Sequence, residues 1–145
     1  MNNKSPIKSS RSAFCINPLY FDEQLKCASF DVRLGAMTPE LTHELDIQKL
    51  FDAYPDLRKH RCESGRHRSF FDEARQTETA HLLEHVAVEL LALSGVSRDK
   101  ARGQTGIPQG EKRNFYRLRL YGADSLGQAD VFLREAAIVL DDLLL

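Results

Sequence analysis

The sequence predicts an α+β domain in which about three helices pack mainly on one face of a small mixed or antiparallel sheet. Two observations favour this class. Segments with strand-like alternation and longer segments with helical periodicity follow one another along the chain. The 145 residues, of which 42% are hydrophobic and 28% charged, suit one soluble globular domain with one core.

The N-terminal segment, residues 1–20, is rich in Ser, Lys, Asn and Pro, and we expect an irregular arm before a domain that spans residues 21–145. Its polar start lacks the apolar stretch of a signal peptide. Three cysteines without C-x-x-C spacing argue against a disulfide framework and favour a reducing, cytoplasmic setting. No apolar run is long enough to span a bilayer, so we expect no membrane partner. A net charge of −1 gives no general attraction to nucleic acid, and no nucleic-acid partner is expected.

Three elements are predicted in the first half of the domain. Leu25–Leu34 alternates apolar and polar residues, as a half-buried strand should. Thr38-Pro39-Glu40 is typical of an N-cap with Pro at the first helical position, so a helix is expected from Pro39 to about Ala53. His60–Cys62 then reads as a short strand, followed by a Gly-containing basic loop over residues 63–68.

The second half is expected to begin with a helix from about Thr77 to Leu93, which Ser94-Gly95 ends. The sequence does not decide whether an additional strand forms near Arg102–Gly106. Phe115–Tyr121 alternates strongly and predicts a strand. A last helix is expected from about Gln128 to Leu143, and its apolar content indicates that it is substantially buried.

The most informative motif is His81-Leu82-Leu83-Glu84-His85, inside the predicted helix. Residues four apart on a helix are neighbours, so His81 and His85 can bind one metal ion, and Glu84 lies beside them. The order H-x-x-E-H is that of the inverzincins. Because a catalytic zinc ion takes three protein ligands and keeps one position open, a third ligand must come from elsewhere in the fold.

Four residues are candidates for the third ligand. We favour Cys62, because its segment enters a Gly-containing loop just before the motif helix. His60 shares that segment and would point to the same side of a strand. Glu89 lies one helical turn beyond the motif, and Glu135 lies in the last helix. The alternatives without a metal are a helix with a polar border and a small buried cysteine.

A basic cluster comprises Arg58–Arg61 and Arg66–Arg68. We interpret it as a solvated loop rather than as a surface for carboxylates or phosphates, although arginine forks suit such anions. The glycines between Gly103 and Gly110 match neither G-x-G-x-x-G nor a Walker A loop, and no G-x-S-x-G is present. Nucleotide binding and serine hydrolysis are therefore not expected.

Three stretches carry a family resemblance: Tyr54-Pro55-Asp56-Leu57, then His60-Arg61-Cys62-Glu63-Ser64-Gly65 with Thr77 after it, then His81-Leu82-Leu83-Glu84-His85-Val86-Ala87-Val88-Glu89-Leu90. Together they resemble the N-terminal domain of cyanophycin synthetases, over residues 51–143. The resemblance implies His81 and His85 as metal ligands, Glu84 as general base and Cys62 as a candidate third ligand. It also implies a domain that holds an arginine-aspartate polymer and, in some members, cuts it.

Two departures from that family pattern matter. Cyanophycin synthetases continue into an ATP-grasp module and a Mur-ligase-like module, which this sequence does not contain. We therefore expect a stand-alone domain that cannot by itself perform ATP-driven polymer synthesis. Gly106 stands where the family often carries an arginine, which argues against a polymer contact at that position.

The leading hypothesis is a small zinc-dependent hydrolase of peptide or isopeptide bonds, with arginine-aspartate polymers as candidate substrates. His81, His85 and Cys62 would hold the zinc, and Glu84 would act as general base. The alternatives are a non-catalytic module that binds a polymer or a partner protein, and a structural zinc domain. The expected partner is a peptide or polypeptide-like substrate, and assembly into a homo-oligomer stays open.

Overall fold

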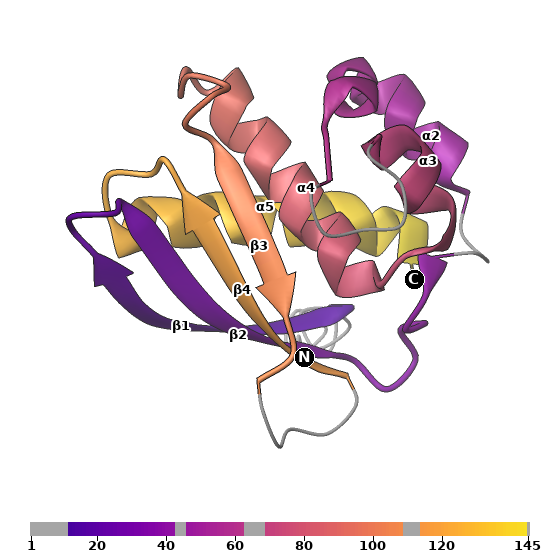
Figure 1. Ribbon diagram of the computed structural model, residues 1–145. Helices are drawn as coiled ribbons and strands as arrows, with labels where there is room; N and C mark the ends of the chain where they lie inside the picture. Colours follow the sequence, from indigo (N-terminus) through magenta and orange to yellow (C-terminus); the bar gives the residue numbers. More distant parts are fainter. Residues whose placement is uncertain (1–11, 43–45, 63–68, 109–113, 145) are drawn as a thin grey trace, which may run out of the picture.

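The described strands form one antiparallel sheet, which makes one layer of the molecule (Figure 1). The computed structural model describes residues 12–42, 46–62, 69–108 and 114–144. The strand order is β1-β2-β4-β3, so β1 and β3 form the two edges. The strands are β1 Phe14–Asp22, β2 Cys27–Leu34, β3 Arg102–Gly106 and β4 Phe115–Tyr121. This architecture confirms the predicted α+β class, with a sheet that is antiparallel throughout.

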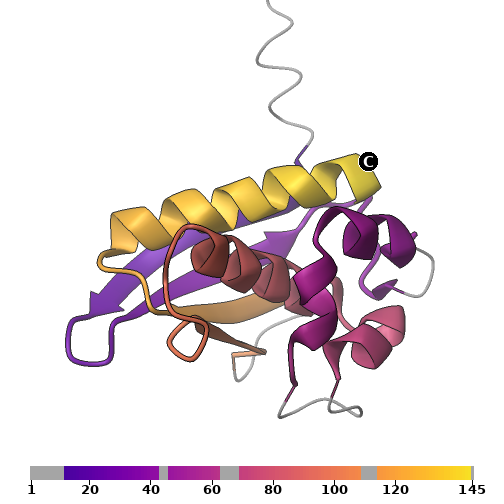
Figure 2. The same cartoon turned by 90° about the horizontal axis from the view of Figure 1, so that it is seen from above.

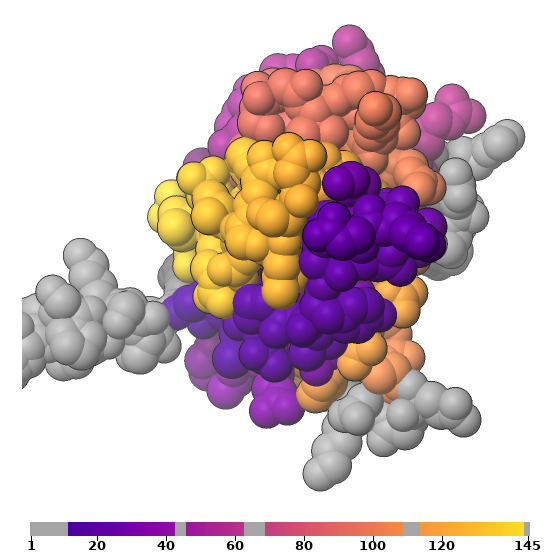
Figure 3. Space-filling view, turned by 90° about the vertical axis from the view of Figure 1, so that its left-hand side faces the viewer, coloured from indigo at the N-terminus to yellow at the C-terminus, as the bar shows by residue number. Residues whose placement is uncertain are grey.

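Two long helices cover one face of this sheet. α4 contacts β3 and β4, α5 contacts β1 and β2, and the two helices pack against each other (Figure 2). From the side of the β1–β2 hairpin, the hairpin and α5 lie next to each other (Figure 3). None of the described helices is long and apolar enough to cross a membrane. The helices are α2 Ile47–Ala53, η2 Pro55–Lys59, α3 Phe70–Glu73, η3 Ala74–Gln76, α4 Thr79–Leu93 and α5 Leu126–Leu144.

The alternation of β4 explains why the sheet has an inner and an outer face. Its buried residues are Tyr116, Leu118 and Leu120. Phe30 of β2 pairs with Leu118, so the buried side chains of both strands point toward the helices. The outer face is polar, and there Arg117 Nε lies 2.6 Å from Asp31 Oδ1. The core therefore lies between the inner face and the two long helices.

The predicted irregular arm over residues 1–20 differs from the structure, because β1 begins at Phe14. Phe14 is buried, and the strand pairs with β2 from Phe14 to Asp22 except at Leu19. The sheet register shifts between Pro18 and Tyr20, which interrupts the period of two and hides the strand in the sequence. Residues 1–11 of the predicted arm lie outside the described residues.

The helix predicted from Pro39 begins later, at Ile47. Leu41 instead forms an isolated bridge with Glu78. The hydroxyl of Thr38 donates to the carbonyl of Ala13 at 2.9 Å, so this residue ties the chain to the start of β1 and does not act as the predicted helix cap. The tertiary hydrogen bond therefore prevails over the local capping signal.

Three elements that border the site agree with the prediction, whereas the short strand predicted over His60–Cys62 does not. The helix predicted over residues 77–93 is α4, and it ends before Gly95, which adopts a φ of +118°. The additional strand near Arg102–Gly106 is β3, and Phe115–Tyr121 is β4. His60–Cys62 contributes only an isolated bridge, between Arg61 and Ser69.

Candidate metal centre

The first half of α4 carries the motif side chains toward two neighbours. On one side lies the segment His60–Cys62, and on the other lies the edge strand β3. His81 and His85 are one helical turn apart and turn toward Cys62, whereas Glu84 turns toward β3. The site therefore depends on three chain segments that are far apart in sequence.

Three donor atoms converge at the first of these neighbours. The Nε2 atoms of His81 and His85 lie 3.1 Å apart. Cys62 Sγ lies 3.8 Å from His81 Nε2 and 3.5 Å from His85 Nε2. Around a tetrahedral zinc ion, two nitrogens are separated by about 3.3 Å, and a nitrogen and a sulfur by about 3.6 Å. The three side chains therefore fit one tetrahedral metal ion.

Partners behind the two imidazoles can accept a hydrogen from each Nδ1 atom. His81 Nδ1 lies 2.9 Å from Thr77 Oγ1, and His85 Nδ1 lies 2.9 Å from His60 Nδ1. If both Nδ1 atoms carry the hydrogen and donate it outward, both Nε2 lone pairs face Cys62. This pattern, in which the second nitrogen of a ligand histidine is hydrogen-bonded, is typical of protein metal sites.

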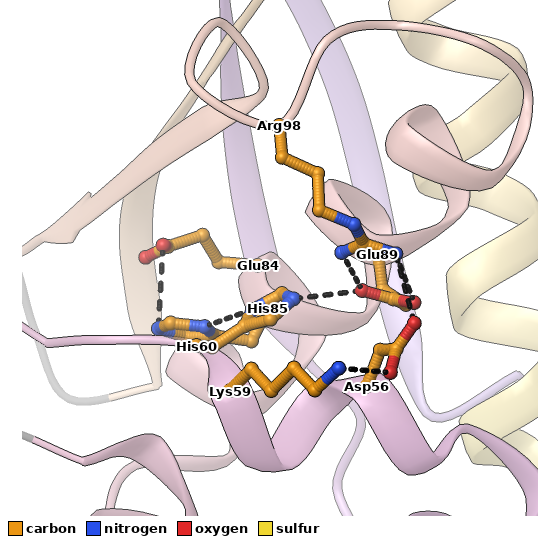
Figure 4. Close-up of polar contacts among 7 residues, drawn as sticks. All are labelled: Asp56, Lys59, His60, Glu84, His85, Glu89 and Arg98. Carbon is orange, nitrogen blue, oxygen red and sulfur yellow. Dashed lines mark hydrogen bonds and ion pairs between the residues drawn. The ribbon is translucent and has the colours of Figure 1, made fainter.

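His60 continues this chain of hydrogen bonds toward the surface (Figure 4). Its Nε2 lies 2.8 Å from Glu89 Oε1, and Arg98 binds both oxygens of Glu89, at 2.8 and 3.1 Å. Burial raises the pKa of Glu89, but the hydrogen bonds from Arg98 and His60 outweigh it and lower the pKa. The ionised carboxylate accepts the Nε2 hydrogen of His60, which leaves His60 Nδ1 to accept from His85.

Glu84 lies beside the donor cluster and is nearly fully buried. Its Oε1 accepts a hydrogen bond from Thr105 Oγ1 at 2.7 Å, and its Oε2 lies 3.7 Å from His85 Nε2. Gly103 provides the space, since a Cβ there would lie 2.5 Å from Glu84 Cγ. Burial raises the pKa of Glu84 to about 7, partly opposed by the Thr105 hydrogen bond. The carboxyl group can thus exchange a proton near neutral pH.

Burial also sets the protonation of the donors. It lowers the pKa values of His81 and His85, so both rings are neutral at pH 7 and can donate a lone pair. It raises the pKa of the Cys62 thiol to about 12, with further contributions from the negative charges of Glu73 and Glu84. The thiol therefore keeps its proton until a metal ion displaces it.

The cluster opens to a cavity of about 1010 Å³. Cys62, His81, His85 and Glu84 line it, together with the consecutive residues 101–108, which include all of β3. On the protein side, the ring of Phe70 stacks on His85 with centroids 3.8 Å apart. One side of the cluster is thus packed against protein, and the other is accessible to a molecule in the cavity.

The structure separates the four candidates for the third ligand. Cys62 lies within the donor cluster. His60 and Glu89 lie behind it, bonded to each other. Glu135 is exposed on α5 and does not line the cavity, so its choice as an alternative ligand was wrong.

Sequence reasoning missed four residues that shape the site. Thr77 precedes His81 by four residues, and this repeat of the His81–His85 spacing could have indicated it. Arg98, Gly103 and Thr105 carry no comparable signal, because each reaches the site only through tertiary packing.

The predicted basic cluster is only partly described. Arg58 lies over the ring of Phe71, with its guanidinium carbon 4.8 Å from the centroid, and Lys59 pairs with Asp56 at 3.4 Å. Arg66–Arg68 and the predicted loop over residues 63–68 lie outside the described residues.

Fold and site together define a small α+β domain with a buried Cys/His/His cluster that could hold a metal ion. A family model described as the cyanophycin synthase-like N-terminal domain matches residues 27–130. The chain belongs to this family. The matched range includes the donor cluster, Glu84 and three of the four strands. No curated protein and no solved structure matches the chain.

Proposed function

We propose that this chain is a zinc-dependent hydrolase of peptide or isopeptide bonds. The observation that carries the proposal is the position of a buried carboxylate, Glu84, beside a three-donor cluster at the wall of a cavity. Thiolate and imidazole donors suit zinc. Three protein ligands leave the fourth position open, as a catalytic site requires. When bound, zinc would polarise the scissile carbonyl and make water more acidic.

The side chains of the chain would divide the remaining work. Cys62, His81 and His85 would hold the metal. Glu84 Oε1 is fixed by Thr105, so Oε2, the oxygen nearer His85, is the one that accepts the proton of the attacking water. The same carboxyl group then delivers the proton to the leaving amine.

The replacement Glu84→Gln tests the proposal. Glutamine keeps the size of the side chain and an oxygen for Thr105, but it cannot accept a proton, so hydrolysis should fall about 10²–10⁴-fold while zinc content stays the same. The assay follows release of amines from arginine-aspartate polymers and from aspartyl isopeptides, with zinc measured by elemental analysis.

The exposed Glu135 provides the matched control, since Glu135→Gln should change neither quantity. Full activity in the Glu84→Gln protein would remove Glu84 as the base. Stoichiometric zinc without hydrolysis in the unchanged protein would favour a structural zinc domain or a binding module.

Zinc affinity should rise about tenfold per pH unit between about pH 8 and 9. The Cys62 thiol, whose pKa is raised to about 12, keeps its proton in this range and must release it when zinc binds. His81 and His85, with lowered pKa values, are already neutral and release none. Competition with a chelator of known pH dependence measures the slope.

Cys62→Ala is the variant that isolates the thiol in this experiment. The two remaining imidazoles should bind zinc more weakly and with a flat pH profile over the same range. A flat profile in the unchanged protein would exclude the Cys62 thiolate as a ligand.

A further inference from the structure

The cavity runs along one complete edge of the sheet. β3 has β4 on one side, and no strand of the described chain pairs with its other side. Residues 101–108, which contain β3, all line the cavity. In Figure 1, β3 lies beside α4, which carries the motif side chains. A molecule in the cavity would therefore meet both the donor cluster and an open strand edge.

The hydrogen-bond pattern of the sheet identifies which backbone groups face this edge. The Leu34 N–H donates to the Asn114 carbonyl, and the Gly122 N–H donates to the Lys26 carbonyl. Because bonding direction alternates along an antiparallel strand, the even-numbered residues of β4 face β2 and the odd-numbered ones face β3. The partners of the odd-numbered residues are Arg102, Gln104 and Gly106.

The residues between these partners turn their backbone the other way. Gly103 and Thr105 therefore present their N–H and C=O groups to the open edge. These same two residues border Glu84, one by lacking a side chain and the other by its hydroxyl. A peptide paired with this edge would run past the carboxylate of Glu84.

The charges around the edge favour a peptide with carboxylates. Two of the arginines that line the cavity, Arg102 and Arg119, lie at this end of the sheet. Arg102 lies over the ring of Tyr121, 4.7 Å from its centroid. Arg119 lies on the neighbouring strand, β4, opposite Gln104 of β3. Within residues 12–42, 46–62, 69–108 and 114–144, no carboxylate forms an ion pair with either arginine. Side chains of an added strand that point to the outer face would meet this pair.

We propose that the free edge of β3 binds an extended acidic peptide as an added strand. The backbone of the peptide pairs with Gly103 and Thr105, and every second side chain, a carboxylate, faces Arg102 and Arg119. Binding at this edge does not depend on the proposed function. Only the additional point that the bound peptide is also the substrate rests on it. Backbone pairing of this kind gives affinity, and the alternate side chains give specificity.

Binding is measured with the Glu84→Gln protein, so that hydrolysis does not interfere. The probe is a fluorescein-labelled peptide of alternating Asp and Thr, followed by fluorescence anisotropy. N-methyl groups are placed on successive peptide amides, one per peptide. Because every second amide of an added strand faces β3, affinity should fall about tenfold at alternate positions and stay unchanged between them. Equal losses at all positions, or none, would overturn the inference.

Two replacements at Thr105 test the protein side. Thr105→Pro removes the edge N–H, and proline is tolerated at a strand edge where that group does not pair within the sheet. Thr105→Val replaces the hydroxyl with a methyl group and keeps the N–H, so it is the reference for the loss of the hydroxyl. We expect the proline variant to bind about tenfold more weakly than the valine variant. If the proline variant does not fold, the N-methyl series alone decides the question.

The charge component has its own control. Exchanging Asp for Asn in the peptide should weaken binding and reduce its dependence on salt, because the arginine contacts are lost. An unchanged affinity would overturn the acidic specificity. The inference and the proposed function fail separately, since alternating N-methyl effects without any hydrolysis contradict only the hydrolase, and hydrolysis without alternation contradicts only the edge binding.

Discussion

Replacing His85 with alanine is expected to abolish zinc binding and hydrolysis together. Its Nε2 lies close to both other donors, at 3.1 Å from His81 Nε2 and 3.5 Å from Cys62 Sγ. Loss of this ligand should weaken zinc binding by more than about 100-fold, beyond the range seen when only an outer hydrogen-bond partner of a ligand is removed. The zinc content after dialysis measures the effect.

Thermal melting gives a second readout of the same change. A metal ion that binds only the folded protein raises the melting temperature, so zinc should stabilise the unchanged protein and not the His85→Ala variant. His60→Gln serves as a graded control, because it changes the hydrogen-bond partner of His85 Nδ1 and of Glu89 but no donor atom of the cluster, and it should cost about 10–100-fold in zinc affinity. Normal zinc binding by His85→Ala would mean that the cluster is not the metal site.

Adding one methyl group at Gly103 is expected to remove hydrolysis while zinc remains bound. A Cβ at this position would lie 2.5 Å from Cγ and 2.8 Å from Oε2 of Glu84, which is too close for real contacts. The Glu84 side chain is buried and can move only by leaving its position beside Thr105. Gly103→Ala should therefore lower activity as much as Glu84→Gln, and overpacking should also destabilise the fold by about 1–3 kcal/mol.

The same strand offers the matched control. A Cβ at Gly106 would meet no atom within 4 Å, so Gly106→Ala should leave activity, zinc content and stability unchanged. Hydrolysis rates, zinc content and urea denaturation of both variants make the comparison. Full activity in Gly103→Ala would show that the observed position of Glu84 is not needed for the reaction.

The strongest periodic patterns predicted the elements that build the site. Alternation in Phe115–Tyr121 predicted β4, and the helical pattern with Ser94-Gly95 at its end predicted α4. The weaker patterns failed where tertiary contacts prevailed. β1 forms because pairing with β2 buries Phe14, and the hydroxyl of Thr38 bonds to the start of β1. Both contacts join residues distant in sequence, which local propensity does not register.

The candidate site shows the same contrast between residues that the sequence predicted and residues whose roles only the structure separated. The choice of Cys62 among four candidates rested on its place in the chain, and the structure brings it to the two histidines. His60 and Glu89 were considered as ligands, but they lie in the hydrogen-bonded chain behind His85. Residue types alone could not separate these cases, because histidine and glutamate serve both as ligands and as partners of ligands.

The sequence by itself determined that His81, Glu84 and His85 lie together, because the rise and turn of an α-helix bring residues three and four apart to one surface. Only the tertiary structure decided what meets them. Packing of α4 against β3 places Thr105 and Gly103 at Glu84, and the bridge between Arg61 and Ser69 accompanies the placement of Cys62 beside the histidines. These distances depend on burial of a shared core. The free energy of that burial comes from residues along the whole chain and not from any local motif.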